Sequence, residues 1–280
     1  MKTLLIGELH KDAELLLSEK TEFEKIANLE EKQYDHEAVV LRTFTEFKEA
    51  QINQFPNVKY VVSCSVGIDN IDWNLLKEKG IELIFIPGTN TNSVAEHTVH
   101  LILSILRNQQ PFAELKDKTL GIIGFGAIGK IVAEKVQGFG CRIIAFDVIE
   151  QDPAVLQKLN TEMKDFDTVL READIVTVHV PLNKHTKELV NATGFERMKW
   201  GSFFINTSRA EVVEEQGLID DFNDGRFRGV ALDVYSDSLK EQLEGKGNII
   251  FTEHVAAQGE DSFRNQCMKP IEKLLETISR

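Results

Sequence analysis

The amino-acid sequence predicts an α/β protein built from two parallel-sheet domains separated by a cleft. Short apolar runs alternate with helix-like stretches along almost the whole chain, which is the pattern of strands joined by crossover helices. A glycine-rich turn at residues 124–129 separates an apolar run from a helix-like stretch. The length of 280 residues is enough for two domains of ordinary size. Together these observations favour two sheets of the Rossmann-like or flavodoxin-like type.

The charge balance and the cysteines exclude several classes of partner. The 45 acidic residues outnumber the 32 basic ones and give a net charge of −13, which argues against binding to nucleic acid or to an anionic membrane. No apolar run approaches the length of a membrane span, and the N-terminus lacks the pattern of a signal peptide. The three cysteines are few and widely spaced, which favours a cytoplasmic location and argues against disulfides or a metal site.

The first part of the chain supplies the elements of one domain. The expected elements are strands at 3–6, 38–41, 60–63 and 82–86, with polar helical stretches at 12–18 and 73–79. Apolar residues at helical spacing then predict one long helix over 93–107. Ser93 and Glu96 have the Ser-x-x-Glu spacing of a capping box, so the helix is expected to begin there.

The glycine-rich turn has the spacing of a dinucleotide-binding unit. A buried strand is expected at 120–123 before the turn, and a helix at 127–139 after it. Gly124 permits the tight turn, Gly126 lets the backbone approach a pyrophosphate, and Gly129 lets the helix lie close to the strand.

The start of this helix and the end of the next strand complete the unit. Ala127 and Ile128 open the helix, where unpaired N–H groups and the positive end of the helix dipole favour phosphates. A second strand at 142–146 ends at Asp147. Its carboxylate can accept both ribose hydroxyls and would repel a 2′-phosphate. The expected cofactor is therefore NAD rather than NADP.

The alternation continues to the end of the chain. Further strands are expected at 175–178, 203–206, 230–232 and 249–251, and an amphipathic helix, interrupted at Pro270, is expected at 261–279. Because the nucleotide-binding unit lies in the middle, the segments on both sides should form a second domain. The expected division is an NAD-binding domain at 93–255 and a substrate domain at 1–92 plus 256–280.

Several further segments together resemble the D-isomer-specific 2-hydroxyacid dehydrogenases, from about residue 38 to about residue 265. The segments are 65–72, 92–97, 177–182 with Thr186, 198–199, 204–209, 229–234 and 252–256. Their order and spacing are more specific than any one of them. The resemblance implies an NAD-dependent enzyme that transfers a hydride between NAD(H) and a small D-2-hydroxy acid or 2-keto acid.

Two residues carry the expected chemistry. Arg209 and His254 each follow an expected strand, so both should lie at the edge of the sheet where ligands bind. A guanidinium can grip a carboxylate through two hydrogen bonds and polarise the neighbouring keto oxygen. An imidazole can deliver or remove a proton near neutral pH. The resemblance assigns these roles to Arg209 and His254. His97 and His100 lie on the long helix, where packing explains them.

The resemblance also implies residues that bind the substrate and the cofactor. Val66 and Gly67 would bind the substrate carboxylate through backbone N–H groups, and Asp233 would accept from the nicotinamide carboxamide. Arg42 matches a basic position of the phosphoglycerate dehydrogenases, but Ser63 stands where that branch usually carries an arginine, so phosphoglycerate is not the favoured substrate. The remaining cofactor contacts that the resemblance implies are Val180, Pro181, Thr186 and Thr207.

One departure from the family concerns the partner of the histidine. The family places a glutamate five residues after the aspartate that matches Asp233, and this chain has Ser238 there. A loop shifted by one residue would let Asp237 serve, and this is the preferred explanation. Glu253 could serve instead, although adjacent side chains on an extended segment point to opposite faces. In the third explanation His254 has no carboxylate partner and a lower pKa.

The expected protein is therefore an enzyme that forms a homodimer through its NAD domains, as the family usually does. Its other partner is a small 2-hydroxy or 2-keto acid. The alternative is a non-catalytic or weakly active member of the family that senses NAD or binds another protein. The missing glutamate favours this alternative, whereas the presence of both Arg209 and His254 counts against it. A relative of formate dehydrogenases is a further, less favoured interpretation.

Overall fold

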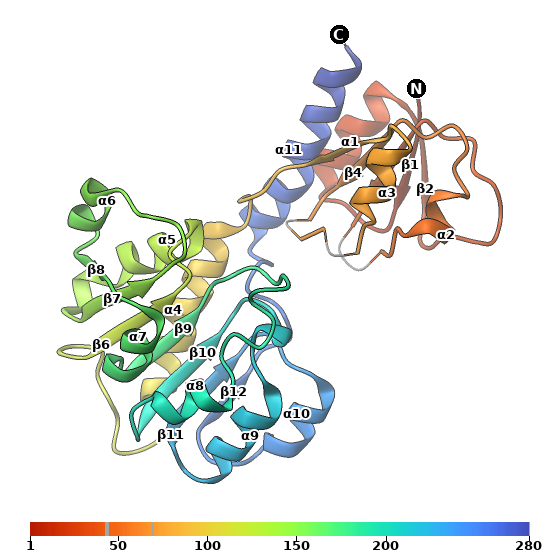
Figure 1. The fold of residues 1–280 in the computed structure, drawn as a ribbon. Helices are drawn as coiled ribbons and strands as arrows, with labels where there is room; N and C mark the ends of the chain where they lie inside the picture. The colour runs from red at the N-terminus through yellow and green to blue at the C-terminus, as the bar shows by residue number, and fades with distance from the viewer. Residues whose placement is uncertain (43–44, 66, 69, 280) are drawn as a thin grey trace. The chain divides into compact units, whose positions relative to one another are not determined.

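The computed structural model describes residues 1–42, 45–65, 67–68 and 70–279. The chain divides into two compact units, one of Met1–Asn90 with Gln258–Arg280 and one of Thr91–Ala257 (Figure 1). Within the described ranges, no helix is both long and apolar enough to cross a membrane.

The first unit contains a five-stranded parallel sheet in the order β2-β1-β3-β4-β5. Its strands are β1 (Lys2–Ile6), β2 (Glu22–Ile26), β3 (Ala38–Leu41), β4 (Tyr60–Ser63) and β5 (Glu82–Phe85), and its helices are α1 (Lys11–Lys20), α2 (Glu49–Ile52), α3 (Trp73–Glu78) and α11 (Glu260–Ile278). Leu4 and Ile6 belong to the core on one face, and Leu5 belongs to the core on the other. The four strands expected from apolar runs are confirmed, and the edge strand β2 is additional.

Helix α11 differs from its expected form. The sequence predicts an interruption at Pro270, and this is wrong, because α11 continues through Pro270. Proline removes one helical hydrogen bond. Cys267, Ile271 and Leu274 lie fully buried in the core that α11 shares with β1, β3 and β4, and this burial stabilises the helix on both sides of the proline.

The second unit contains a seven-stranded parallel sheet in the order β12-β11-β10-β9-β6-β7-β8. Its strands are β6 (Thr119–Ile123), β7 (Arg142–Phe146), β8 (Thr161–Met163), β9 (Ile175–Val178), β10 (Ser202–Asn206), β11 (Phe227–Leu232) and β12 (Ile249–Phe251). The strand order reverses at β6, since β7 lies on one side of it and β9 on the other. Such a reversal opens a crevice at the carboxyl ends of the strands.

Helices cover both faces of this sheet (Figure 1). They are α4 (Thr91–Arg107), α5 (Ala127–Val136), α6 (Pro153–Lys158), α7 (Phe166–Glu172), α8 (Ala192–Arg197), α9 (Glu215–Asn223) and α10 (Asp237–Leu243), with short 3-10 turns at Gln137–Phe139 and Ala210–Val212. Buried residues of α4 and α5 form the core on one face, and those of α7 to α10 form the core on the other. The prediction of a parallel α/β fold with two sheets is confirmed.

The start of α4 also differs from its expected form. The helix begins at Thr91, two positions before Ser93, so the predicted capping box is wrong. The hydroxyl of Ser93 donates instead to the carbonyl oxygen of Ala256 at 2.7 Å. The carboxylate of Glu96 accepts from Asn92 and Lys135 at 3.0 Å each. Glu96 thus bonds to two side chains, and Ser93 bonds to a carbonyl oxygen outside the helix.

Candidate active site

Two of the three glycines of the pattern are required by the fold, Gly124 in the turn after β6 and Gly129 in the first turn of α5. Gly124 has a φ of +93° and lies so close to β9 that a Cβ would stand 2.9 Å from the backbone of His179 and Val180. At Gly129 a Cβ would stand 2.3 Å from the carbonyl oxygen of Gly124. These close contacts join α5, the end of β6 and the segment after β9 at the crevice.

The third glycine faces open space. A Cβ on Gly126 would meet nothing within 4 Å, so the fold itself does not require a glycine there. Gly126 directly precedes α5, and no side chain caps this helix. The N–H groups of its first turn have no partner within the helix. An open approach beside a helix N-terminus fits a pyrophosphate.

Asp147 joins the end of β7 to the glycine turn. Its Oδ2 accepts the backbone N–H of Phe125 at 2.7 Å, and its Oδ1 accepts that of Ile149 at 2.9 Å. The carboxylate is therefore fixed beside the turn at the place where a ribose would follow the pyrophosphate. The residues present fit a dinucleotide.

The other residues expected to contact the cofactor lie on loops after β9 and β10. A Cβ on Gly124 would stand 2.9 Å from the Val180 side chain, so Val180 adjoins the glycine turn. The hydroxyl of Thr186 donates to the carbonyl oxygen of Pro181 at 2.5 Å and closes the loop between them. Thr207 is buried, with its hydroxyl 2.9 Å from that of Thr98 on α4.

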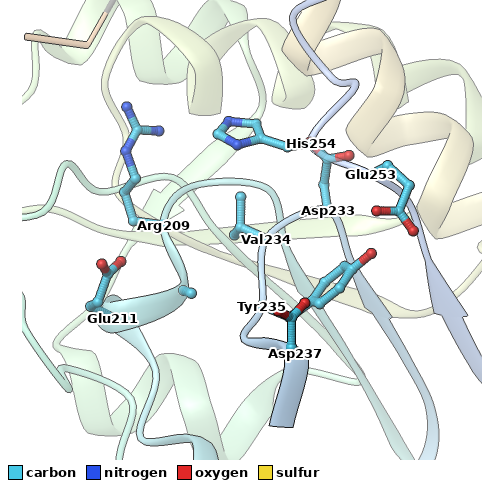
Figure 2. A pocket seen from close by; sticks show the side chains of 9 residues that line it. Arg209, Glu211, Asp233, Val234, Tyr235, Asp237, Glu253 and His254 are labelled. Atoms are coloured by element: carbon cyan, nitrogen blue, oxygen red, sulfur yellow. The ribbon is translucent and has the colours of Figure 1, made fainter. Parts of the chain in front are cut away.

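Arg209 and His254 line one pocket of the second unit (Figure 2). The pocket has a volume of about 380 Å³. Three loops that follow β10, β11 and β12 supply its walls. Its lining residues are Arg209, Ala210, Glu211, Asp233, Val234, Tyr235, Asp237, Glu253 and His254. Figure 2 shows the guanidinium and the imidazole facing each other across the pocket, with the carboxylate of Asp233 beside the imidazole.

The side chain of Asn206 shapes the loop that carries Arg209. Its Nδ2 donates to the carbonyl oxygen of Arg209 at 2.9 Å, and its Oδ1 accepts the N–H and the hydroxyl of Ser208 at 3.0 and 2.8 Å. The Nη1 of Arg209 donates to the carbonyl oxygen of Ser208 at 2.8 Å. A guanidinium carries five donors in a planar fork, a geometry that matches a carboxylate.

Asp233 holds the loop that carries His254. Its buried carboxylate accepts the hydroxyl of Thr252 at 2.5 Å and the backbone N–H groups of Val255 and Ala256 at 3.0 and 3.1 Å. Burial alone would raise the pKa of Asp233, but hydrogen bonds, first among them one from His97, hold it below its ordinary value. The group is therefore an anion within the wall of the pocket, and its oxygens can accept further bonds, as from a carboxamide.

The environment of His254 combines strain with opposing charges. Its φ of +51° is uncommon for a residue with a side chain, and its backbone N–H donates to the carbonyl oxygen of Asp233 at 3.0 Å. Burial lowers the pKa of its imidazole below the ordinary value. The charge of Asp233 opposes this shift, and that of Arg209 adds to it.

Asp237 and Glu253, the two carboxylates considered as replacements for the family glutamate, also line this pocket. Asp237 is exposed in the first turn of α10, and Figure 2 shows it beside the Tyr235 ring rather than beside His254. Glu253 accepts from the Nζ of Lys240 at 2.6 Å, so its carboxylate has another partner. Of these carboxylates, Asp233 is the one whose charge raises the pKa of His254.

The expected substrate residues lie in the first unit. Val66 lies outside the described residues. Gly67 follows β4, and its carbonyl oxygen accepts the hydroxyl of Ser65 at 2.8 Å. Arg42 follows β3, where its Nη1 donates to the carbonyl oxygen of Cys64 at 2.6 Å and its guanidinium lies 4.8 Å from the centre of the Phe263 ring.

Sequence reasoning missed the contribution of α4. His97, for which only packing was expected, has its Nε2 3.0 Å from the hydroxyl of Thr252 and 3.4 Å from Oδ1 of Asp233. Thr252 directly follows β12, but His97 lies on a helix, away from the glycine turn and from the ends of the strands. Their pairing joins positions far apart in the chain, so no local signal could have shown it.

Comparisons with known proteins agree on one family. The family model described as "D-isomer specific 2-hydroxyacid dehydrogenase, NAD binding domain" matches residues 91–256. The hydroxypyruvate reductase of Thermotoga maritima is 30% identical in a match that covers 96% of this chain and 96% of that protein. The D-3-phosphoglycerate dehydrogenase of Bacillus subtilis is 31% identical over 90% of this chain, but the match spans only 51% of that longer protein.

Solved structures give the same result over the whole chain. The D-lactate dehydrogenase of Aquifex aeolicus, complexed with NAD and lactic acid, has a TM-score of 0.85 and 26% sequence identity. The match covers 99% of this chain and 95% of that one.

Proposed function

The chain belongs to the D-isomer-specific 2-hydroxyacid dehydrogenases and shares their NAD-dependent chemistry, and we propose that Arg209 and His254 perform it on a small 2-keto acid. The observation that carries the proposal is that both side chains line one pocket of the unit that also holds the glycine turn. Such a pocket lies at the carboxyl ends of the parallel strands, where open α/β sheets bind their ligands.

Each proposed residue does a definite task in the reduction. The guanidinium of Arg209 binds the substrate carboxylate and polarises the keto oxygen. The protonated imidazole of His254 donates its proton to that oxygen as negative charge develops on it, and the neutral imidazole takes the proton back in the reverse direction. NAD(H), when bound, supplies or accepts the hydride.

The cofactor would be held by the glycine turn and the loops beside it. The N–H groups of the turn from Gly124 to Gly129 would bind the pyrophosphate, and Asp147 would accept the ribose hydroxyls. Asp233 would accept from the carboxamide and so orient the nicotinamide ring. The loops that carry Val180, Pro181, Thr186 and Thr207 would complete this site.

The substrate domain would help Arg209 to hold the substrate carboxylate. We assign this role to residues 1–92 with 256–280, and NAD binding to 93–255. Val66 and Gly67 would bind the carboxylate through backbone N–H groups, and Arg42 would contribute positive charge. The relatives named hydroxypyruvate reductase and glyoxylate reductase favour a small substrate.

Two carboxylates compete for the task of the glutamate that the family places beside its histidine. Asp237 follows from the shifted-loop hypothesis, and it lines the pocket. Asp233 has the stronger physical support, because its charge raises the pKa of His254. We therefore propose Asp233 as the principal electrostatic partner, with Asp237 as the alternative.

The test is oxidation of NADH by the purified protein with glyoxylate, hydroxypyruvate or pyruvate, and the absorbance of NADH measures the rate. Turnover on at least one of them is expected, and it should be lost in His254→Asn. Tight binding of NADH without turnover on any 2-keto acid would instead support the NAD-sensing alternative.

Analogy with the family supports a proposal on assembly, and the few, widely spaced cysteines support one on location. We propose a homodimer formed through the NAD domains of a cytoplasmic enzyme. Sedimentation equilibrium should give twice the mass of the chain at micromolar concentration, and a monomer at all concentrations would contradict the dimer.

A further inference from the structure

We propose that His97 is a positioning residue for His254, which it reaches through the side chains of Thr252 and Asp233. The inference rests on the proposed function, because it concerns the reaction that His254 performs. His97 lies on α4, outside the three loops that form the pocket.

A directed chain of hydrogen bonds joins His97 to Asp233. The hydroxyl of Thr252 donates its one proton to Oδ1 of Asp233 at 2.5 Å. The same hydroxyl oxygen lies 3.0 Å from Nε2 of His97. Since the hydroxyl proton is already used, Nε2 must carry a proton, which it shares between this oxygen and Oδ1 of Asp233 at 3.4 Å. The chain thus runs from His97 through Thr252 to Asp233 and fixes the orientation of all three side chains.

The carboxylate at the end of this chain determines the path of the backbone beside His254. Oδ1 of Asp233 also accepts the N–H of Val255, and Oδ2 accepts that of Ala256. The N–H of His254 donates to the carbonyl oxygen of the same aspartate. A shift of the carboxylate would therefore move the residues on both sides of His254. The left-handed backbone of His254, with φ +51°, persists only where such contacts hold it.

Because they are buried, the hydrogen bonds between His97, Thr252 and Asp233 hold these side chains more strongly than exposed hydrogen bonds would. The side chain of Asp233 is 1% exposed and that of His97 is 16% exposed. Hydrogen bonds are stronger in buried surroundings, and a buried acceptor that loses its donor raises the free energy of the folded protein. The charged groups that act on His254 are Asp233 and Arg209, so a displaced Asp233 would change the field at the imidazole as well as its position.

The experiment compares three variants at matched positions. His97→Leu removes the donor, and His97→Gln keeps an N–H at the position of Nε2. His100→Leu is the control, because His100 lies on the same helix with its ring 5.9 Å from that of His97 but is exposed. NADH oxidation with the best 2-keto acid gives kcat and KM, NADH fluorescence gives the cofactor Kd, and hydrogen exchange reports on the amides of Val255 and Ala256.

The expected result for His97→Leu is a fall in kcat of about tenfold, the effect of one buried hydrogen bond, while the Kd for NADH changes less than about twofold. The amides of Val255 and Ala256 should exchange about tenfold faster, with the rest of the sheet unchanged. His97→Gln should restore most of the kcat and most of the amide protection. His100→Leu should resemble the unmodified protein.

Two failures are distinguishable. If the unmodified protein turns over no 2-keto acid, the proposed function fails, and the exchange of the two amides still tests the hydrogen-bond chain. If the unmodified protein is active but His97→Leu keeps its kcat and its amide protection, the inference about His97 is overturned. A loss that His97→Gln does not restore, with faster exchange throughout the unit, would also overturn it.

Discussion

His254 donates its backbone N–H to the carbonyl oxygen of Asp233 at 3.0 Å, and its imidazole lies beside the carboxylate of the same residue (Figure 2). The aspartate thus acts on the histidine in two ways. It fixes the backbone that carries the imidazole, and its negative charge raises the pKa of that imidazole against burial and against Arg209. The pH dependence of the reaction should report the second effect.

Reduction of a 2-keto acid should become slower as the pH rises through the pKa of His254. The reason is that the protonated imidazole is the acid, and it is present only below its pKa. Because burial lowers this pKa, the fall should occur below the ordinary histidine value of about 6.5. Oxidation of the hydroxy acid needs the neutral imidazole and should already be at its plateau near pH 7. The profiles of kcat/KM in both directions measure this, and a fall centred clearly above the ordinary value would contradict it.

Substitution of the two competing carboxylates should separate their roles. Asp233→Asn removes the charge that raises the pKa of His254, so the fall in the reduction profile should move to lower pH. Asp237→Asn removes an exposed carboxylate near Tyr235 and should leave the profile in place. Thermal denaturation of both variants controls for folding. A shift in Asp237→Asn with none in Asp233→Asn would restore the shifted-loop explanation.

Arg209→Lys should lower kcat/KM for the 2-keto acid by at least about tenfold. A lysine keeps the charge but loses the planar fork that binds a carboxylate through two parallel bonds, and one hydrogen bond to a charged group contributes about 1.5–3 kcal/mol. The Kd for NADH should be nearly unchanged. Arg171→Lys, at an exposed position of α7, is the matched control. Equal activity of Arg209→Lys and the unmodified protein would remove Arg209 from the proposed site.

The sequence predicted most strands because apolar runs in parallel sheets are buried on both faces. It missed β2 (Glu22–Ile26) and β8 (Thr161–Met163), which lie at sheet edges. Glu22, Glu24 and Lys25 are exposed, so β2 has no continuous apolar run for a pattern to detect.

The candidate site also contains residues that a local pattern predicts and contacts that no local pattern predicts. Arg209, His254 and the glycine turn belong to local patterns, from which they were predicted. The link from His97 to Thr252 could not be predicted, because it joins α4 to the loop after β12 across 155 positions. The hydroxyl of Ser93 likewise bonds to Ala256 across 163 positions, where the local pattern indicated a cap. The tertiary contact, absent from the local sequence, determines the role of each side chain.

Asp147→Ala should shift the preference of the enzyme from NADH toward NADPH. The carboxylate would accept from the ribose hydroxyls, and its charge would repel a 2′-phosphate. The ratio of kcat/KM for NADH to that for NADPH should fall by about tenfold or more, the effect of one charge-assisted hydrogen bond. Glu150→Ala removes the same charge from an exposed position nearby and should leave the ratio unchanged. A constant ratio in Asp147→Ala would mean that this residue only anchors the glycine turn through Phe125.

Alanine at Gly126 and at Gly129 should have opposite consequences. In Gly129→Ala the new Cβ would lie 2.3 Å from the carbonyl oxygen of Gly124. Alanine in a helix is favoured over glycine by about 1 kcal/mol, but overpacking costs about 1–3 kcal/mol. At 2.3 Å the clash should dominate and lower the thermal denaturation midpoint.

In Gly126→Ala the Cβ meets nothing within 4 Å, so the midpoint should stay the same. If the open space at Gly126 is the approach of the pyrophosphate, its methyl group should weaken NADH binding by at least about tenfold, since 1.4 kcal/mol changes Kd tenfold. Unchanged NADH affinity in a stable Gly126→Ala variant would show that the cofactor does not pass close to this residue.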